Sequence, residues 1–220
     1  MTETWDKDFD DEPHVRGVLH RPNGAFDTAF VLVHGAGGAK GSPLLVALAD
    51  EFARNGNGIG ALRIDLPYRQ KRPKGPPSPS GAAKDRRGIV RAIESLGVDR
   101  TFVGGTSYGG RQATMLAAEE PDLAAGLLII SYPLHPPGKP ERLRTEHFPT
   151  LRTPALFVHG SRDGFGSLDE MKEHLPLLAG GHKLVEFASS GHGLVTSRSS
   201  QQDVESCAAR IVTEFQAFVR

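Results

Sequence analysis

Short apolar runs alternate along the chain with segments in which apolar residues recur every three or four positions. Residues 28–34 (TAFVLVH) are almost continuously apolar, which is typical of a strand buried on both faces of a sheet. Residues 43–54 begin with a proline and carry their large apolar side chains on one helical face. The same reasoning predicts further strands at residues 14–20, 58–65, 101–104, 123–131, 154–159 and 183–188. It predicts further helices at residues 82–96, 111–120, 168–178 and 201–220.

Strands and helices alternate almost throughout, and this order indicates an α/β fold with a mostly parallel, doubly wound sheet and helices on both faces. In such sheets ligands bind at the carboxyl ends of the strands. We expect the acidic residues 1–13 to be flexible and residues 14–220 to form a single domain. The proline-rich segments 66–80 and 132–150 are predicted to be irregular connections at the active edge of the sheet.

Composition narrows the functional classes. The 220 residues suit one domain with a sizeable core, and the formal net charge is zero. A neutral chain argues against recruitment to nucleic acid or to a membrane surface by bulk charge. The single cysteine, Cys207, excludes an internal disulfide. With no signal peptide or membrane-length apolar run in view, we expect a cytoplasmic protein.

A candidate nucleophile follows the strand predicted at 101–104. Residues Gly105 to Gly109 read Gly-x-Ser-x-Gly, with Ser107 at the centre and a run of strong helix formers afterwards. The short motif by itself is weak, since an idle serine in a glycine-rich turn would look the same. The strand before it and the helix after it supply the context of a nucleophile elbow. Ser107 is therefore the predicted nucleophile.

A candidate acid and base also follow strands. Asp163 comes after the strand predicted at 154–159, and His192 comes after the one predicted at 183–188. Serine, acid and histidine thus occur in the chain order of an α/β-hydrolase triad. The alternative acids, Asp169 and Glu186, lie inside predicted elements. Other histidines begin or end strands and are expected to be structural: His34, His159 and His182.

Each member of this set would have a defined role. A serine hydroxyl needs a neighbouring base, here His192, and that base needs an orienting carboxylate, here Asp163. The tetrahedral intermediate needs two N–H donors. We expect these to be the backbone N–H of Tyr108 and that of Ala36, with Gly37 as the next candidate.

A competing motif precedes the first predicted helix. Residues 35–42 (GAGGAKGS) follow a strand and partly match a phosphate-binding P-loop. That motif ends in Gly-Lys-Ser, whereas Lys40 and Gly41 are transposed here, which moves the lysine away from the helix start. No dinucleotide fingerprint and no Cys/His cluster with metal-ligand spacing is present in the sequence. We therefore expect neither a cofactor nor a metal.

Taken together, these motifs resemble the α/β-hydrolase superfamily over residues 28–220. More narrowly, the chain is similar to a small lidless group that contains testis-expressed hydrolase-like proteins and a subunit domain of the NSL complex, and also to dienelactone-hydrolase-like proteins. The resemblance rests on HGAGG at 34–38, DLPY at 65–68, GGTSYGGR at 104–111, SYPLHPPGKPERLR at 131–144, LFVHGSRDGFG at 156–166 and GHG at 191–193. It implies an α/β-hydrolase fold with a minimal lid and a filled triad.

The connection at 132–150 is too short for a large helical lid, so we expect an open, shallow site that favours short or polar acyl groups. Tyr68, Arg72, Arg111 and His135 are candidate pocket residues. The basic residues of segment 66–80 together with Arg111 either favour an anionic substrate or form a solvated surface.

The sequence thus predicts a serine hydrolase that cleaves small carboxylic esters through an acyl-enzyme. The alternative is a non-catalytic interaction module on the same scaffold, because a fold does not fix a function. One relative in the resembling group is a subunit of a chromatin complex, which keeps this alternative open.

Overall fold

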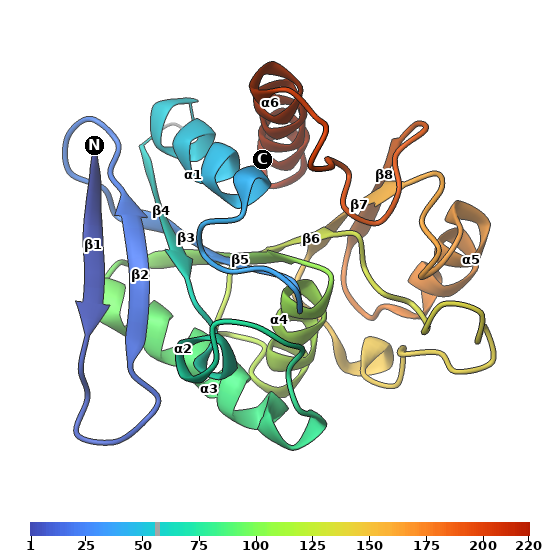
Figure 1. Cartoon of the computed structure of the whole chain (residues 1–220), viewed down its shortest axis with the longest axis horizontal. Helices are drawn as coiled ribbons and strands as arrows, with labels where there is room; N and C mark the ends of the chain where they lie inside the picture. The colour runs from blue at the N-terminus through green and yellow to red at the C-terminus, as the bar shows by residue number, and fades with distance from the viewer. Residues whose placement is uncertain (56–57) are drawn as a thin grey trace.

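Eight strands form one sheet in the computed structural model, which describes residues 1–55 and 58–220 (Figure 1). Their spatial order is β1-β2-β4-β3-β5-β6-β7-β8. The strands are β1 (Thr2–Lys7), β2 (Val15–His20), β3 (Thr28–Val33), β4 (Ile59–Ile64), β5 (Arg100–Thr106), β6 (Leu127–Ile130), β7 (Ala155–Gly160) and β8 (His182–Phe187). From β4 through β8 every neighbouring pair is parallel, while β1 and β2 are antiparallel additions at one edge.

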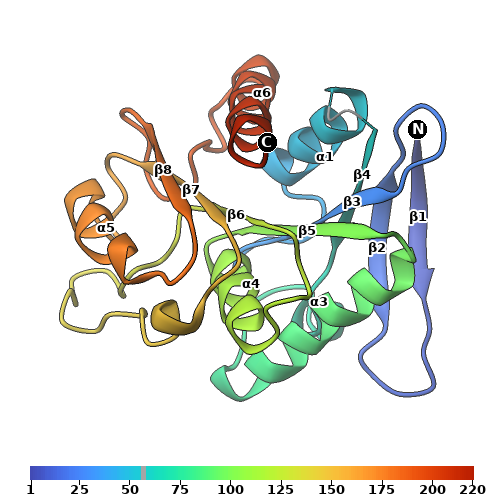
Figure 2. The same ribbon diagram turned by 180° about the vertical axis from the view of Figure 1, so that it is seen from behind.

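Helices cover both faces of this sheet (Figures 1 and 2). On one face lie α1 (Pro43–Asn55) and α6 (Gln201–Phe218), which pack against each other. On the other face lie α2 (Pro67–Lys71), α3 (Ala82–Leu96) and α4 (Tyr108–Glu119), and α5 (Leu168–His174) lies near β8. The doubly wound α/β fold predicted from the alternation of elements is confirmed.

The two layers of the core follow from the two-residue period of the central strands. On β3, Phe30 and Leu32 face α1 and α6, whereas Val31 and Val33 face α3 and α4. Phe30 stacks on Phe52 of α1 with ring centroids 4.5 Å apart. The nearly continuous apolar run of β3 is explained by this arrangement, because both faces of the strand are buried.

The N-terminal segment differs from its prediction. Residues expected to be flexible form β1, which pairs with β2 in register from Thr2 opposite His20 to Lys7 opposite Val15. Its Trp5 Nε1 donates a hydrogen bond of 3.0 Å to Ser95 Oγ on α3. Six acidic residues suggested a solvated tail, but an edge strand accepts charged side chains on its open face.

Several boundaries also differ. Segment 66–80 was predicted to be irregular, yet Pro67 begins the short helix α2, since a proline is well tolerated in the first helical turn. The strand predicted at 123–131 is shorter and is confined to Leu127–Ile130. The helix predicted at 168–178 ends at His174, and a 3-10 turn, Leu175–Leu177, follows where Pro176 lacks an N–H.

Candidate active site

Ser107 occupies a sharp turn between β5 and α4. Its backbone angles are φ 50° and ψ −114°, a strained conformation that few residues other than glycine adopt. A Cβ on Gly105 would lie 2.7 Å from the Val33 carbonyl oxygen, and one on Gly109 would lie 2.5 Å from that of His34. The two motif glycines are therefore required because strand, turn and helix approach so closely.

Three polar side chains from three different loops form a continuous hydrogen-bonded chain. His192 Nε2 lies 2.7 Å from Ser107 Oγ, and His192 Nδ1 lies 2.8 Å from Asp163 Oδ2. These distances are within hydrogen-bond range for a nucleophile, a base and an orienting carboxylate. The loops after β5, β7 and β8 meet here because parallel strands end at the same edge of the sheet.

The loop after β7 fixes the carboxylate and the imidazole. The Asp163 side chain is fully buried, and its Oδ1 accepts a hydrogen bond of 2.8 Å from the Phe165 backbone N–H. The Phe165 ring stacks on the His192 imidazole with centroids 4.0 Å apart. Phe165 was not singled out from the sequence, although its place two residues after the predicted acid was a usable signal.

The glycine loop after β3 is held by its carbonyl oxygens. Tyr68 OH donates to Ala36 O at 2.8 Å and to Gly35 O at 3.2 Å, and Arg69 Nη2 donates to Ala36 O at 2.9 Å. Arg69 Nε also donates to Gly38 O at 2.8 Å. In a trans peptide the N–H points opposite to the C=O. Binding these carbonyls on one side therefore turns the N–H groups of Ala36 and Gly37 to the other side.

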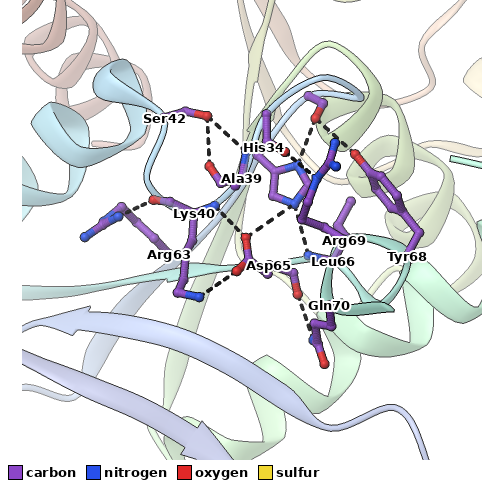
Figure 3. Close-up of polar contacts among 12 residues, drawn as sticks. His34, Ala39, Lys40, Ser42, Arg63, Asp65, Leu66, Tyr68, Arg69 and Gln70 are labelled. Atoms are coloured by element: carbon purple, nitrogen blue, oxygen red, sulfur yellow. Dashed lines mark hydrogen bonds and ion pairs between the residues drawn. The ribbon is translucent and has the colours of Figure 1, made fainter. Parts of the chain in front are cut away.

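The base of the same loop is fixed by His34 and Asp65 (Figure 3). Buried His34 accepts a hydrogen bond at Nε2 from the Leu66 N–H, 3.1 Å away, and burial lowers its pKa. Asp65 accepts bonds from the Lys40 N–H at 2.7 Å and from Lys40 Nζ at 2.6 Å. The lysine of the P-loop-like segment is thus bound to a carboxylate within the protein.

A buried carboxylate on α3 forms hydrogen bonds with both α2 and α4, the two helices that begin beside this site. Asp85 accepts hydrogen bonds from Tyr108 OH at 2.7 Å and from the Tyr68 N–H at 3.0 Å. Burial raises the pKa of Asp85, while these two hydrogen bonds oppose the shift. Asp85 was not predicted from the sequence. The available signal was its spacing from Ile89, which places an acid on the apolar face of a helix.

A cavity of about 900 Å³ opens over Ser107 and His192. This volume is near the upper end of the range for small-molecule sites. Its walls come from the glycine loop after β3, the start of α1, residues 76–82, the first two turns of α4 and the loop after β8. Ala36, Gly37 and Tyr108 are among its lining residues.

The comparisons with known proteins agree with this architecture. The model of the alpha/beta hydrolase domain matches residues 26–220. The chain belongs to the α/β-hydrolase family. Among solved structures, dienelactone hydrolase from Anabaena variabilis is similar with a TM-score of 0.73 and 19% identity, covering 100% of this chain and 99% of that one. Est1E from Butyrivibrio proteoclasticus has a TM-score of 0.71 and 18% identity over 97% and 99%.

An alpha-beta serine hydrolase homologue from Coxiella burnetii is similar at a TM-score of 0.73 and 17% identity, covering 96% of each chain. At these identities the three structures establish the shared fold. The narrower resemblance to the testis-expressed group stays a prediction.

The predicted pocket residues of this hydrolase are only partly brought together. Arg111 lines the cavity, but the other three do not lie among its lining residues. Tyr68 supports the glycine loop from behind, and Arg72 donates to Pro76 O at 3.1 Å on the exposed side of its segment. Buried His135 donates from Nδ1 to Pro136 O at 2.8 Å.

The basic segment after β4 also points elsewhere. Arg69 is buried behind the glycine loop, and Lys71 Nζ lies 3.2 Å from Glu12 Oε2. Of the sequence features that suggested an anionic substrate, only Arg111 is therefore at the cavity.

Within residues 1–55 and 58–220, no group of three His, Cys, Asp or Glu side chains is placed to hold a metal ion. Over the same ranges, no helix combines the length and the apolar character that crossing a bilayer would take.

Proposed function

We propose that this α/β-hydrolase is a carboxylic ester hydrolase that works through Ser107, His192 and Asp163. The observation that carries the proposal is the continuous chain from Ser107 Oγ to His192 and on to Asp163, with steps of 2.7 Å and 2.8 Å, at a strained elbow. A serine held in this way is an activated nucleophile, because its proton has an acceptor within hydrogen-bond distance.

In the first half-reaction, Ser107 Oγ attacks the ester carbonyl carbon while its proton passes to His192 Nε2. Buried Asp163 accepts the Nδ1–H hydrogen bond and stabilises the imidazolium that forms. Protonated His192 then gives its proton to the alcohol oxygen, the ester C–O bond breaks, and an acyl-enzyme remains. In the second half-reaction, water attacks the acyl carbon and gives a proton to His192 Nε2. His192 then returns a proton to Ser107 Oγ, and the acid is released.

The negative charge of each tetrahedral intermediate falls on the former carbonyl oxygen, and backbone N–H groups would bind it. We assign the Tyr108 N–H, at the free N-terminal end of α4, together with the N–H groups of Ala36 and Gly37. The hydrogen bonds from Tyr68 and Arg69 to the carbonyls on the far side support this assignment.

The names of similar structures support ester chemistry without fixing a substrate. They include a dienelactone hydrolase and Est1E, one structure of which holds ferulic acid. We propose short or polar acyl esters, as the short connections suggest, with room in the cavity for an additional apolar group.

The test is labelling of the whole protein with a fluorophosphonate, which reacts with activated serines whatever the natural substrate. We expect wild type to be labelled and both Ser107→Ala and His192→Ala to be unlabelled. Ser80→Ala, in an exposed part of the segment near the cavity, is the matched control and should be labelled like wild type. Hydrolysis of 4-nitrophenyl acetate by the same proteins gives the second readout.

A folded wild-type protein that is neither labelled nor active would contradict the proposal. The non-catalytic interaction module would then be the better description of this chain.

A further inference from the structure

Two arginines contribute to the wall of the cavity over Ser107. Arg111 lies one turn into α4, where its N–H donates to the Ser107 carbonyl oxygen at 2.9 Å. Arg144 comes from the connection after β6, far away in the sequence. The two charged side chains therefore reach the same cavity from different elements, and both belong to its lining together with the nucleophile.

Among the described residues, no carboxylate forms an ion pair with Arg111 or Arg144. Over the same residues, the buried Nε of Arg111 and the buried Nε2 of Gln112 have no hydrogen-bond partner. Gln112 is fully buried and lines the cavity beside Arg111. Arg144 Nη1 donates only to a carbonyl, that of Pro133, at 3.2 Å.

Other arginines on this side of the sheet have carboxylate or carbonyl partners, although the buried Nε of Arg91 also lacks a hydrogen-bond partner among the described residues. The Arg69 guanidinium donates to four backbone carbonyl oxygens, those of Ala36, Gly38, Arg72 and Gly75. Arg86 Nε lies 2.9 Å from Glu119 Oε2, and Arg91 pairs with Asp11. Arg111 differs because its charge is left next to a second cation. Burial, followed by the neighbouring Arg111 charge, lowers the pKa of Arg144, and the Glu146 charge opposes this shift more weakly.

We propose that Arg111 and Arg144 bind a carboxylate carried by the substrate, so that the enzyme prefers esters with a free acid group. This rests on the proposed ester hydrolysis and specifies its substrate class. A guanidinium donates two parallel hydrogen bonds to a carboxylate, which gives both affinity and orientation. The remaining walls include Leu44, Leu45, Met115 and Val195, so the body of the substrate is apolar.

The substrates that fit are monoesters of dicarboxylic acids and esters of hydroxylated carboxylic acids. In both, the anion would be held by the arginines while the ester carbonyl is at Ser107.

The first experiment compares two matched pairs of esters on the purified full chain. One pair places the charge on the acyl side, 4-nitrophenyl hemiglutarate against 4-nitrophenyl hexanoate. The other places it on the alcohol side, 4-acetoxybenzoate against methyl 4-acetoxybenzoate. We expect wild type to favour the anionic member of at least one pair, and Arg111→Gln or Arg144→Gln to reduce that preference about tenfold or more, through KM.

Arg142→Gln is the matched control. It removes the same charge from the same connection, but Arg142 is exposed and does not line the cavity. Its preference should equal that of wild type. A loss as large as that of Arg111→Gln would show that only the overall charge matters, which would overturn the proposal.

The second experiment separates binding from catalysis. In the Ser107→Ala background, monomethyl glutarate is titrated by calorimetry, with and without Arg111→Gln. We expect the dissociation constant to rise about tenfold with Arg111→Gln and to stay unchanged with Arg142→Gln. If wild type is labelled by a fluorophosphonate and cleaves neutral esters, but shows no anionic preference and no arginine-dependent binding, this inference fails while the proposed function stands. If labelling itself fails, the proposed function fails.

Discussion

Arg69 Nη2 donates a hydrogen bond to the Ala36 carbonyl oxygen across 2.9 Å, and this contact ties α2 to the glycine loop beside Ser107. Arg69 is buried, and its Nε binds Gly38 O at 2.8 Å, so one side chain holds two carbonyls of the loop. The basic segment after β4 therefore has a structural role, support of the glycine loop, which its sequence did not suggest. It also makes the loop geometry dependent on the planar shape of a guanidinium.

Replacing Arg69 with lysine should therefore weaken catalysis while keeping the charge. A lysine ammonium cannot reproduce two hydrogen bonds in the same fixed plane. We expect kcat for a neutral ester to fall about tenfold, which is the effect of losing one well-placed hydrogen bond on the loop. Arg87→Lys, an exposed residue of α3, is the control and should behave like wild type. An unchanged kcat in Arg69→Lys would show that the loop does not need this contact.

Asp163→Asn should remove most activity without unfolding the protein. The carboxylate holds the Nδ1–H of His192, whereas an asparagine can turn its NH2 toward Nδ1 and favour the wrong tautomer. We expect kcat to fall about a thousandfold or more. Asp169→Asn, at the nearby exposed acid that was the alternative candidate, should keep full activity. Equal losses in both variants would contradict the assignment of Asp163.

Gly109→Ala should destabilise the protein. The added Cβ would lie 2.5 Å from the His34 carbonyl oxygen and 2.9 Å from that of Val33, both of which are backbone atoms that cannot easily move. We expect a loss of about 1–3 kcal/mol in the free energy of unfolding, or a Tm lower by roughly 2–12 °C. Gly41→Ala is the comparison, because nothing lies within 4 Å of its added Cβ. A Tm of Gly109→Ala equal to that of Gly41→Ala would refute the close approach.

His147 should make stability dependent on pH. It lies after β6 with Nε2 2.9 Å from Thr114 Oγ1, and burial, followed by the Arg111 charge, lowers its pKa from 6.5 to about 4. Between these values the unfolded chain binds a proton that the folded protein does not. The free energy of unfolding contributed by His147 therefore falls as the pH is lowered from about 6.5 to 4.

The measurement is urea unfolding of wild type and His147→Gln at pH 7, 5.5 and 4. We expect the stability of wild type relative to the variant to fall by about 1–3 kcal/mol over this range. A difference that is independent of pH would show that His147 does not remain neutral in the folded protein.

Much of the architecture could be predicted from local pattern. The α/β fold could be predicted from the apolar run at 28–34, the helical face at 43–54 and the alternation of elements. A strand buried on both faces is almost continuously apolar, and this is visible in the sequence. Boundaries were less well predicted where a proline lies near an element end, as at Pro67 and Pro176. The terminal strand β1 was missed because five of its six residues are polar or charged, so it lacks the apolar pattern of a strand, although it pairs with the next strand, β2.

The candidate residues at strand ends were also visible in the sequence, since chain order and strand position place Ser107, Asp163 and His192 on one edge of a parallel sheet. The pocket was not. Arg72 and His135 have the polar character of binding residues but lie outside the cavity lining, whereas Arg144 and Phe165 lie within it. Composition cannot show which way a loop side chain points.

The sequence by itself therefore determined the order of strands and helices, the sheet edge that carries the chemistry and the residue types gathered there, because these depend on local periodicity and on the turn that Gly-Ser-Gly requires. Only the tertiary structure decided which arginines find hydrogen-bond or ion-pair partners within the protein. Arg69 is bound to backbone carbonyls of a loop 33 residues away at Ala36. Among residues 1–55 and 58–220, no carboxylate forms an ion pair with Arg111, whose charge acts on Arg144. The reason is physical: a charge is satisfied by groups that are near in space, and those groups come from segments far apart in the chain.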